Sequence, residues 1–221
     1  MPNSTRVADL SSLNVSQNSG VTNVVFTQSF DNVAIIIENG GIGVFRTEAS
    51  DPITGARVFF LEGGSLTFRD GFNFVDQGVF MSDAGDRLEY RDNAIKRGLV
   101  ELGEGGDKVI FRDGSLKGIE VLFGDDTSKD FAKFVGSAKV KGVAVREFGI
   151  QDKVRIDKKT YSYQDLADLA GGKGVVKIEG IRIFLAEASP PVDSVSPFAS
   201  AAFPPLSVSG DALAPLPPVL A

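Results

Sequence analysis

The segment 68–71 reads Phe-Arg-Asp-Gly, and the segment 111–114 reads Phe-Arg-Asp-Gly again, 43 residues later. Between them, the segment 88–93 reads Leu-Glu-Tyr-Arg-Asp-Asn, in which Tyr replaces Phe and Asn replaces Gly. The three copies therefore repeat with a period near 21 or 22 residues. A period of this length is typical of chains that stack one structural unit many times.

A series of aspartates follows the same register. An aspartate precedes an alternating strand four times, at intervals of 21, 23 and 22 residues. Apolar residues follow each aspartate, and we expect them to point inward. The aspartates are Asp86, Asp107, Asp130 and Asp152, and the inward positions include Leu88, Tyr90, Val109, Phe111, Val154 and Ile156. The segments 24–26 and 44–46 fit the same strand position in earlier repeats, so the register extends toward the N-terminus.

A second apolar run follows in each repeat, after a corner that contains glycine. Lys-Gly pairs at 117–118 and 141–142 mark this corner, and the sequence predicts that Gly55, Gly78 and Gly98 occupy the same slot. Each unit thus has two short strands with period-2 alternation and no helix long enough for a crossover between parallel strands.

Such units close a core only when they are stacked. Each strand then pairs with its copy in the next unit, about 4.8 Å away, and the inward side chains form ladders. The sequence predicts an all-β chain: a parallel β-solenoid of about seven coils of 20–24 residues over 22–157. An antiparallel sandwich, whose turns also recur regularly, is the alternative, but it gives no reason to repeat Phe-Arg-Asp-Gly in register.

The flanking segments differ from the repeats. We expect residues 1–21 to be extended and residues 158–186 to cap the solenoid with a short helix and two strands. Ser162 and Asp165 resemble a capping box before a helix over 164–170, and Gly171 supplies its stop. Residues 187–221 hold eight of the ten prolines and are predicted to be an extended Pro/Ser/Ala-rich tail.

The composition excludes several classes of chemistry. The chain has no Cys and no His, which excludes disulfides, Cys/His zinc sites, thiol nucleophiles and imidazole-based triads. It has 23 basic and 29 acidic residues, a net charge of −6, and basic residues dispersed along the sequence, so nucleic acid is not an expected partner. No apolar run is long enough to span a membrane, and the N-terminus lacks the apolar stretch of a cleaved signal.

The repeat predicts surface columns of charge at the first corner. Structural solvation is one interpretation of these columns, and ligand binding along them is the other. The columns consist of Arg46, Arg69, Arg91 and Arg112 beside Asp70, Asp92 and Asp113.

The segment 103–110 reads Gly-Glu-Gly-Gly-Asp-Lys-Val-Ile and resembles a degenerate nonapeptide of the repeats-in-toxin, or haemolysin-type calcium-binding, proteins. Segments 83–86 and 124–130 are similar but weaker. The resemblance implies a calcium-binding parallel β-roll that leaves the cell by type I secretion, with its address in an uncleaved C-terminal segment. The coils here are longer than those of the family, and the tandem glycine motifs that share calcium between turns are missing.

Seven acidic residues are the candidate calcium ligands if the coil corners align. The alternative is that they are ordinary turn residues that hold tight corners through side-chain bonds to the backbone. They are Asp83, Asp86, Glu104, Asp107, Asp125, Asp126 and Asp130.

We expect no enzymatic activity. The best case for catalysis is a polysaccharide lyase or glycosidase, because coils of about 22 residues are similar to those of pectin-degrading β-helices. Asp125, Asp126 and Asp130 would then supply the acid and base. No coil has the insertion that would build a substrate groove.

The leading functional hypothesis is an extracellular structural protein, at the cell surface or in a matrix, that self-assembles into a filament, fibre or surface layer through its solenoid ends and terminal segments. A monomeric polysaccharide-binding or adhesion module is the second hypothesis, and a virion fibre component is the third. Calcium is the one cofactor considered, and further copies of the chain are the expected partner.

Overall fold

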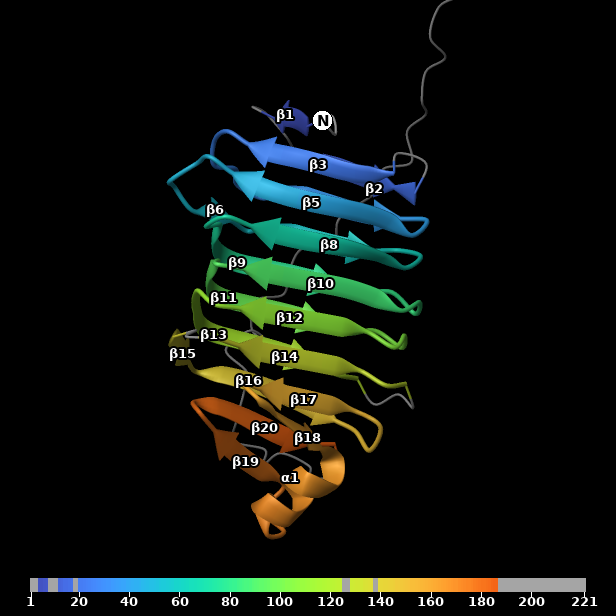
Figure 1. Cartoon of the computed structure of the whole chain (residues 1–221), viewed down its shortest axis with the longest axis vertical. Coiled ribbons are helices and arrows are strands. Elements are labelled where there is room, and N and C mark those ends of the chain that lie inside the picture. Colours follow the sequence, from blue (N-terminus) through green and yellow to red (C-terminus); the bar gives the residue numbers. More distant parts are fainter. Residues whose placement is uncertain (1–3, 8–11, 18–19, 125–127, 137–138, 187–221) are drawn as a thin grey trace, which may run out of the picture. The chain divides into compact units, whose positions relative to one another are not determined.

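The computed structural model describes residues 4–7, 12–17, 20–124, 128–136 and 139–186. The strands in these ranges form two sheets, and the chain alternates between them as it winds along the stack (Figure 1). The predicted tail over 187–221 lies outside the described residues, as do Asp125 and Asp126.

The first sheet, sheet A, has nine strands. Their spatial order follows their order in the chain: β1 (Ser4–Val7), β3 (Val21–Phe26), β5 (Gly41–Thr47), β8 (Gly64–Arg69), β10 (Asp86–Arg91), β12 (Lys108–Arg112), β14 (Phe131–Val135), β17 (Lys153–Ile156) and β18 (Lys159–Ser162).

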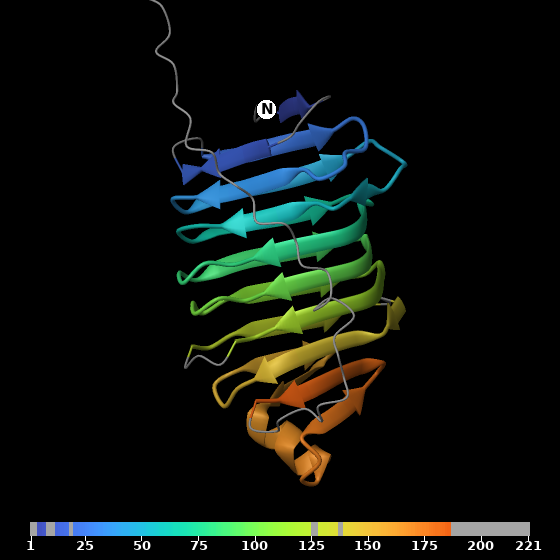
Figure 2. The ribbon, with the colours of Figure 1, turned by 180° about the vertical axis from the view of Figure 1, so that it is seen from behind.

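The second sheet, sheet B, lies behind the first and is seen from the opposite side in Figure 2. Its main path runs through β2 (Ser12–Ser16), β4 (Ala34–Glu38), β7 (Arg57–Phe60), β9 (Asn73–Phe80), β11 (Ala94–Glu101), β13 (Ser115–Leu122), β16 (Val143–Phe148), β20 (Ile181–Leu185) and β19 (Val175–Ile178). Two short strands pair at its side, β6 (Ile53–Thr54) with β9 and β15 (Lys139–Lys141) with β13.

The predicted parallel β-solenoid is confirmed. Neighbouring strands pair in parallel one coil apart along both sheets, which excludes the antiparallel sandwich; only β17 with β18 and β19 with β20 are antiparallel among the described pairs. The stack makes about six turns, whereas the sequence predicted about seven. The count is lower because β17 turns into a hairpin with β18 instead of passing directly to sheet B. At the other end, β1 and β2 already pair with β3 and β4, so parallel stacking begins before residue 22.

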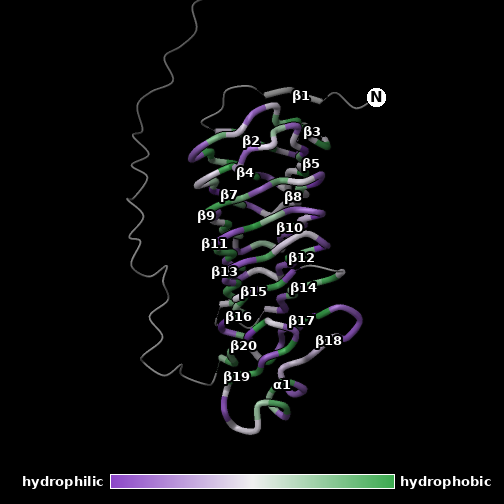
Figure 3. The backbone as a smooth tube through the Cα atoms, turned by 90° about the vertical axis from the view of Figure 1, so that its left-hand side faces the viewer, coloured by the Kyte–Doolittle hydropathy of each residue, from purple (hydrophilic) through white to green (hydrophobic). Residues whose placement is uncertain are grey.

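Period-2 alternation places a ladder of side chains inside the solenoid. In Figure 3 the backbone is coloured by hydropathy, and hydrophobic and hydrophilic residues alternate along the coils. The rings of Phe68 and Tyr90 are stacked with centres 5.3 Å apart, and those of Tyr90 and Phe111 are stacked 5.4 Å apart. Phe134 continues the stack at 5.1 Å from Phe111. The predicted interior column is therefore confirmed, and it consists of Val24, Phe45, Phe68, Tyr90, Phe111, Phe134 and Ile156, all buried.

The second corner confirms the predicted glycine slot in three coils and corrects it in two. Gly55, Gly118 and Gly142 occupy the corner in the left-handed conformation, with φ of 67°, 62° and 65°. In the two coils between Gly55 and Gly118, Asp76 and Arg97 adopt this conformation instead. Gly78 and Gly98, which were predicted to fill the slot, lie later in their strands. Arg97 donates two hydrogen bonds to the Asp76 carboxylate, at 2.5 and 2.6 Å, so an ion pair one coil apart accompanies the unfavourable backbone conformation.

The C-terminal cap forms as predicted. Helix α1 (Tyr163–Ala170) begins at a capping box of Ser162 and Asp165, and it ends at Gly171 in the left-handed conformation. Leu166 and Ala170 of α1 join the hydrophobic core of the solenoid. The chain then returns through β19 and β20, and β20 pairs in parallel with β16.

Candidate functional site

The outer face of sheet A gathers cationic side chains from five consecutive strands. Because successive residues of a strand point to opposite faces, the residues that flank the interior column point outward. Outward positions on β8, β10, β12, β14 and β17 hold the eight residues that we call the basic face: Arg69, Arg87, Arg91, Lys108, Arg112, Lys133, Lys153 and Arg155.

This face corrects the impression from the sequence that the basic residues are dispersed. They are separated along the chain, but a coil of about 22 residues returns each of them to the same side of the stack. Glu89 is the one acidic residue at the outward positions of these five described strands. The face therefore carries a strong excess of positive charge in a chain whose net charge is −6.

Glu89 lies among three arginines of the basic face. Its carboxylate accepts hydrogen bonds from Arg91 and Arg112, each at 2.7 Å, and from Arg87 at 2.9 Å. The Glu89 side chain is 2% exposed, whereas the three arginine side chains are about 40% exposed. Burial raises the pKa of Glu89, but hydrogen bonds from the three guanidinium groups outweigh this effect and lower the pKa to about 2. One carboxylate balances one of three cations, so two positive charges remain.

Lys133 lies in the most crowded part of the basic face. Burial lowers the pKa of its amine, and the nearby charges of Arg112 and Arg155 lower it further. The neighbouring Lys108 amine lies 5.3 Å from the centre of the Phe131 ring. An anion bound over these cations would relieve the repulsion among them. Arg69 lies three strands away on β8, and its buried Nε has no hydrogen-bond partner among the described residues.

A row of aspartates borders the basic face at the first corner. The predicted columns are present here: Arg46 pairs in register with Arg69, and Asp70, Asp92 and Asp113 all have left-handed backbone conformations. Arg46 contacts Asp70 at 3.4 Å, which joins the two columns. The cations therefore occupy the strands, and the carboxylates occupy the edge where the strands end.

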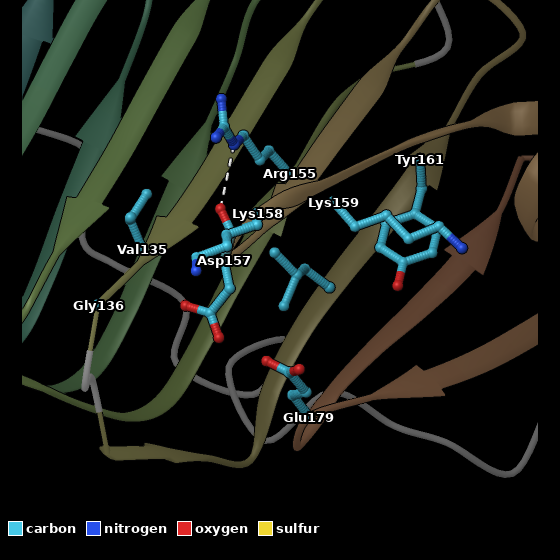
Figure 4. A pocket seen from close by; sticks show the side chains of 9 residues that line it. Val135, Gly136, Arg155, Asp157, Lys158, Lys159, Tyr161 and Glu179 are labelled. Atoms are coloured by element: carbon cyan, nitrogen blue, oxygen red, sulfur yellow. Dashed lines mark hydrogen bonds between the residues drawn. The ribbon is translucent and has the colours of Figure 1, made fainter.

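A pocket of about 730 Å³ opens at the last coil of the basic face (Figure 4). Asp157 and Glu179 present their carboxylates toward each other in this pocket. Burial raises the pKa of Glu179, and the charge of Asp157 and a hydrogen bond to it raise that pKa further. Arg155 Nε donates to the backbone oxygen of Asp157 at 3.0 Å. The lining residues are Val135, Gly136, Arg155, Ile156, Asp157, Lys158, Lys159, Tyr161 and Glu179.

The structure brings together three of the seven predicted calcium ligands. Asp86, Asp107 and Asp130 stack with Asp152 in one buried column at a corner. The carboxylates of Asp107, Asp130 and Asp152 each accept a backbone N–H bond from the preceding coil, and the Asp86 carboxylate accepts one from Ser82 in its own corner. For these residues the hydrogen bonds agree with the alternative interpretation, in which aspartates hold the corners.

The other predicted ligands lie elsewhere. Asp83 is exposed, and Glu104 lines a smaller pocket of about 160 Å³ together with Glu101 and Glu147. In the described ranges, no group of three or more acidic side chains is arranged to hold a metal ion. Among the described residues, no cluster of carboxylates is therefore seen that would supply several of the six to eight oxygens that calcium needs. Asp125 and Asp126 lie outside the described residues, so a calcium site that includes them stays a prediction.

The sequence reasoning missed the basic face and the pocket. The phase of each strand was available, because the residues on either side of an inward residue must point outward. A comparison of those flanking positions across the repeats would have placed Arg87, Lys108, Lys133 and Lys153 together on the outer face. Nothing in the repeat indicates the pocket, since Glu179 comes from the cap.

No helix in the described part of the chain has both the length and the apolar character required to cross a membrane. Comparison of the chain with protein-family models, with curated proteins and with solved structures found no match.

Proposed function

We propose that this protein is a non-catalytic binding module that holds an anionic polysaccharide on its basic face. One observation carries the proposal: eight cationic side chains share the outer surface of five neighbouring strands with a single carboxylate, Glu89. An extracellular or cell-surface location, as expected from the sequence, is part of the proposal.

The arrangement of the cations favours an extended ligand. Neighbouring strands lie about 4.8 Å apart, so the cations form rows that an extended polyanion can follow over several coils. Each exposed ion pair contributes only about 0.2–1 kcal/mol, and useful affinity requires several at once. Arginine also forms paired hydrogen bonds with the planar carboxylate of an acidic sugar.

The same face is poorly suited to nucleic acid. Proteins that bind single strands stack bases on aromatic side chains, and Phe131 is the one aromatic residue at the outward positions of these described strands. Its ring is already in contact with Lys108. Reading of duplex DNA requires a helix or ribbon that enters a groove, whereas these cations lie on the broad surface of a sheet.

Two charge-matched triple variants test the proposal. The face variant carries Lys108→Gln, Lys133→Gln and Lys153→Gln. The control variant changes three exposed lysines that pair in register on sheet B to glutamine, namely Lys96, Lys117 and Lys141. Both variants lose the same net charge, so only the position of the charge differs.

Binding of polygalacturonate is measured by calorimetry at two salt concentrations. We expect the face variant to bind polygalacturonate about 3- to 100-fold more weakly than the wild type, because three exposed or half-buried ionic contacts are lost. The affinity of the control variant should stay within about twofold of the wild-type value. Salt should weaken binding by the wild type, because it screens the ionic contacts. Absence of binding to the wild type, an equal loss in both variants, or tighter binding of DNA than of polygalacturonate contradicts the proposal.

Self-assembly is the second candidate function, and the N-terminal coils favour it. Val21 and Ile42 pair in register on the outside of sheet A and are 51% and 44% exposed. In the described part of the chain, β1 and β2 pair on one side only, which leaves strand edges on which another copy can add. Electron microscopy over a concentration series tests this candidate: fibres or layers that disappear in Ile42→Lys support it, and a wild type that stays monomeric contradicts it.

A further inference from the structure

We infer that the pocket at the last coil binds one acidic sugar unit, whose carboxylate contacts the cations while its hydroxyl groups donate to Asp157 and Glu179. This inference rests on the proposed function and deepens it, because it assigns recognition of an individual sugar to a site at the end of the basic face.

The pocket is continuous with the basic face. Arg155 belongs to that face and also lines the pocket, and Val135, at an outward position of β14, lines it as well. A polysaccharide that follows the rows of cations toward the C-terminal cap therefore reaches this pocket. Its volume of about 730 Å³ lies within the range of about 300–1,000 Å³ for small-molecule sites, which is enough for a sugar ring.

Three cationic residues line the pocket and are available to a carboxylate: Arg155, Lys158 and Lys159. Lys158 is exposed in the turn between β17 and β18, and Lys159 is exposed at the first position of β18, where its amine lies 4.7 Å from the centre of the Tyr161 ring. Arg155 donates its Nε proton to the Asp157 backbone, and a guanidinium group carries five N–H donors in all.

The two carboxylates distinguish an acidic sugar from a simple anion. Asp157 and Glu179 come from different turns, and both have left-handed backbone conformations, with φ of 51° and 48°. They repel each other and would repel a sulfate or phosphate group, so they disfavour ligands that carry only negative charge. The hydroxyl groups of a sugar donate hydrogen bonds without bringing charge, and they satisfy both carboxylates. A ligand with a carboxylate and several hydroxyl groups therefore matches the whole pocket.

A double variant tests the inference. Asp157→Asn with Glu179→Gln removes the two negative charges and keeps the shapes of the side chains. Asp83→Asn with Glu104→Gln is the matched control, since both residues are exposed and neither lines this pocket. Circular dichroism and thermal melting check that each variant is folded.

The probes are trigalacturonate, polygalacturonate and dextran sulfate. We expect the pocket variant to bind trigalacturonate at least about fivefold more weakly, because charge-assisted acceptors for hydroxyl donors are replaced by amides. Its affinity for dextran sulfate should be unchanged or higher, because two repelling charges are gone. The control variant should resemble the wild type with all three probes.

The outcomes separate the two proposals. If the pocket variant binds trigalacturonate as the control does while polygalacturonate still binds the face, the pocket inference is overturned and the proposed function stands. If the wild type binds none of the polymers, the proposed function fails and the pocket inference falls with it. Trigalacturonate binding that disappears with EDTA identifies a cation held between Asp157 and Glu179, and this result also overturns direct recognition of the sugar.

Discussion

The backbone N–H of Asp86 donates a hydrogen bond to Oδ1 of Asp107, one coil further along the solenoid, at 2.7 Å. Asp107 donates in the same way to Asp130 at 2.7 Å, and Asp130 donates to Asp152 at 3.1 Å. All four residues are buried. A charge-assisted bond thus links each corner to the next, which explains physically why aspartate recurs at this spacing.

Removal of one carboxylate from this column should destabilise the fold. Asp107→Ala leaves the buried N–H of Asp86 without its acceptor, at a cost of about 1–3 kcal/mol in the free energy of unfolding. The control is Asp83→Ala, at an exposed position three residues before Asp86, which should change that free energy by less than about 0.5 kcal/mol. Urea unfolding measures both variants, and equal effects would contradict a structural role for the column.

The two identical Phe-Arg-Asp-Gly segments should respond differently to the same substitution. A Cβ on Gly114 would lie 2.0 Å from the backbone oxygen of Asn93, whereas a Cβ on Gly71 would meet no atom within 4 Å. Both glycines have positive φ, of 83° and 90°, so alanine introduces backbone strain of about 1–3 kcal/mol at either position. Gly114→Ala adds a backbone clash and should lower the melting temperature further than Gly71→Ala. The reverse order would contradict the close approach of neighbouring corners.

Acid should destabilise the protein partly through Glu89. Its pKa is about 2 in the folded protein against an ordinary value of 4.5, so its contribution to stability is complete above pH 4.5 and is lost as the pH falls toward 2. Glu89→Gln should cost about 1–3 kcal/mol at pH 7, because three guanidinium groups lose a charged acceptor.

The pH dependence supplies the check on Glu89. Unfolding free energies are compared at pH 5 and pH 3, and the decrease should be smaller in Glu89→Gln than in the wild type. Burial raises the pKa of Asp86, which acts in the opposite direction, but Asp86 is present in both proteins and cancels in the comparison. An identical decrease in both proteins would show that Glu89 is not held charged by the arginines.

The interior column contains one polar interruption. Tyr90 donates its hydroxyl proton to Gln77 Oε1 at 2.8 Å, and both residues are buried. Tyr90→Phe leaves the glutamine oxygen without this donor and should cost about 1–3 kcal/mol. Tyr90→Phe combined with Gln77→Leu removes both partners and should recover most of that stability. If the double variant is less stable than Tyr90→Phe alone, packing rather than hydrogen bonding controls this layer.

The solenoid could be predicted from the sequence, because residues one period apart in a solenoid lie in contact in neighbouring coils. Phe68, Tyr90 and Phe111 occupy equivalent positions in the period, and stacking places their rings over one another. The helix cap could also be predicted, since Ser162 and Asp165 interact over a single turn. Both predictions depend only on the spacing of residue types along the sequence.

The hydrogen-bond and ion-pair partners of the charged residues could not be predicted in this way. Asp86, Asp107 and Asp130 appear in the sequence as acidic corner residues, and only the structure shows that backbone N–H groups donate to their carboxylates. Similarly, Asp76 and Arg97 take a corner conformation that the sequence assigned to glycine, and an ion pair joins them from one coil to the next.

The sequence by itself determined the architecture of this protein: a period of about 22 residues with inward apolar positions requires parallel stacking, since one such unit cannot bury its own core. Only the tertiary structure decided where charge accumulates. Arg69, Lys133 and Arg155 meet on one face because coil length and strand phase together determine which side of the stack each residue reaches. Asp157 and Glu179 meet because the cap returns the chain to the last coil, a path that no local pattern specifies.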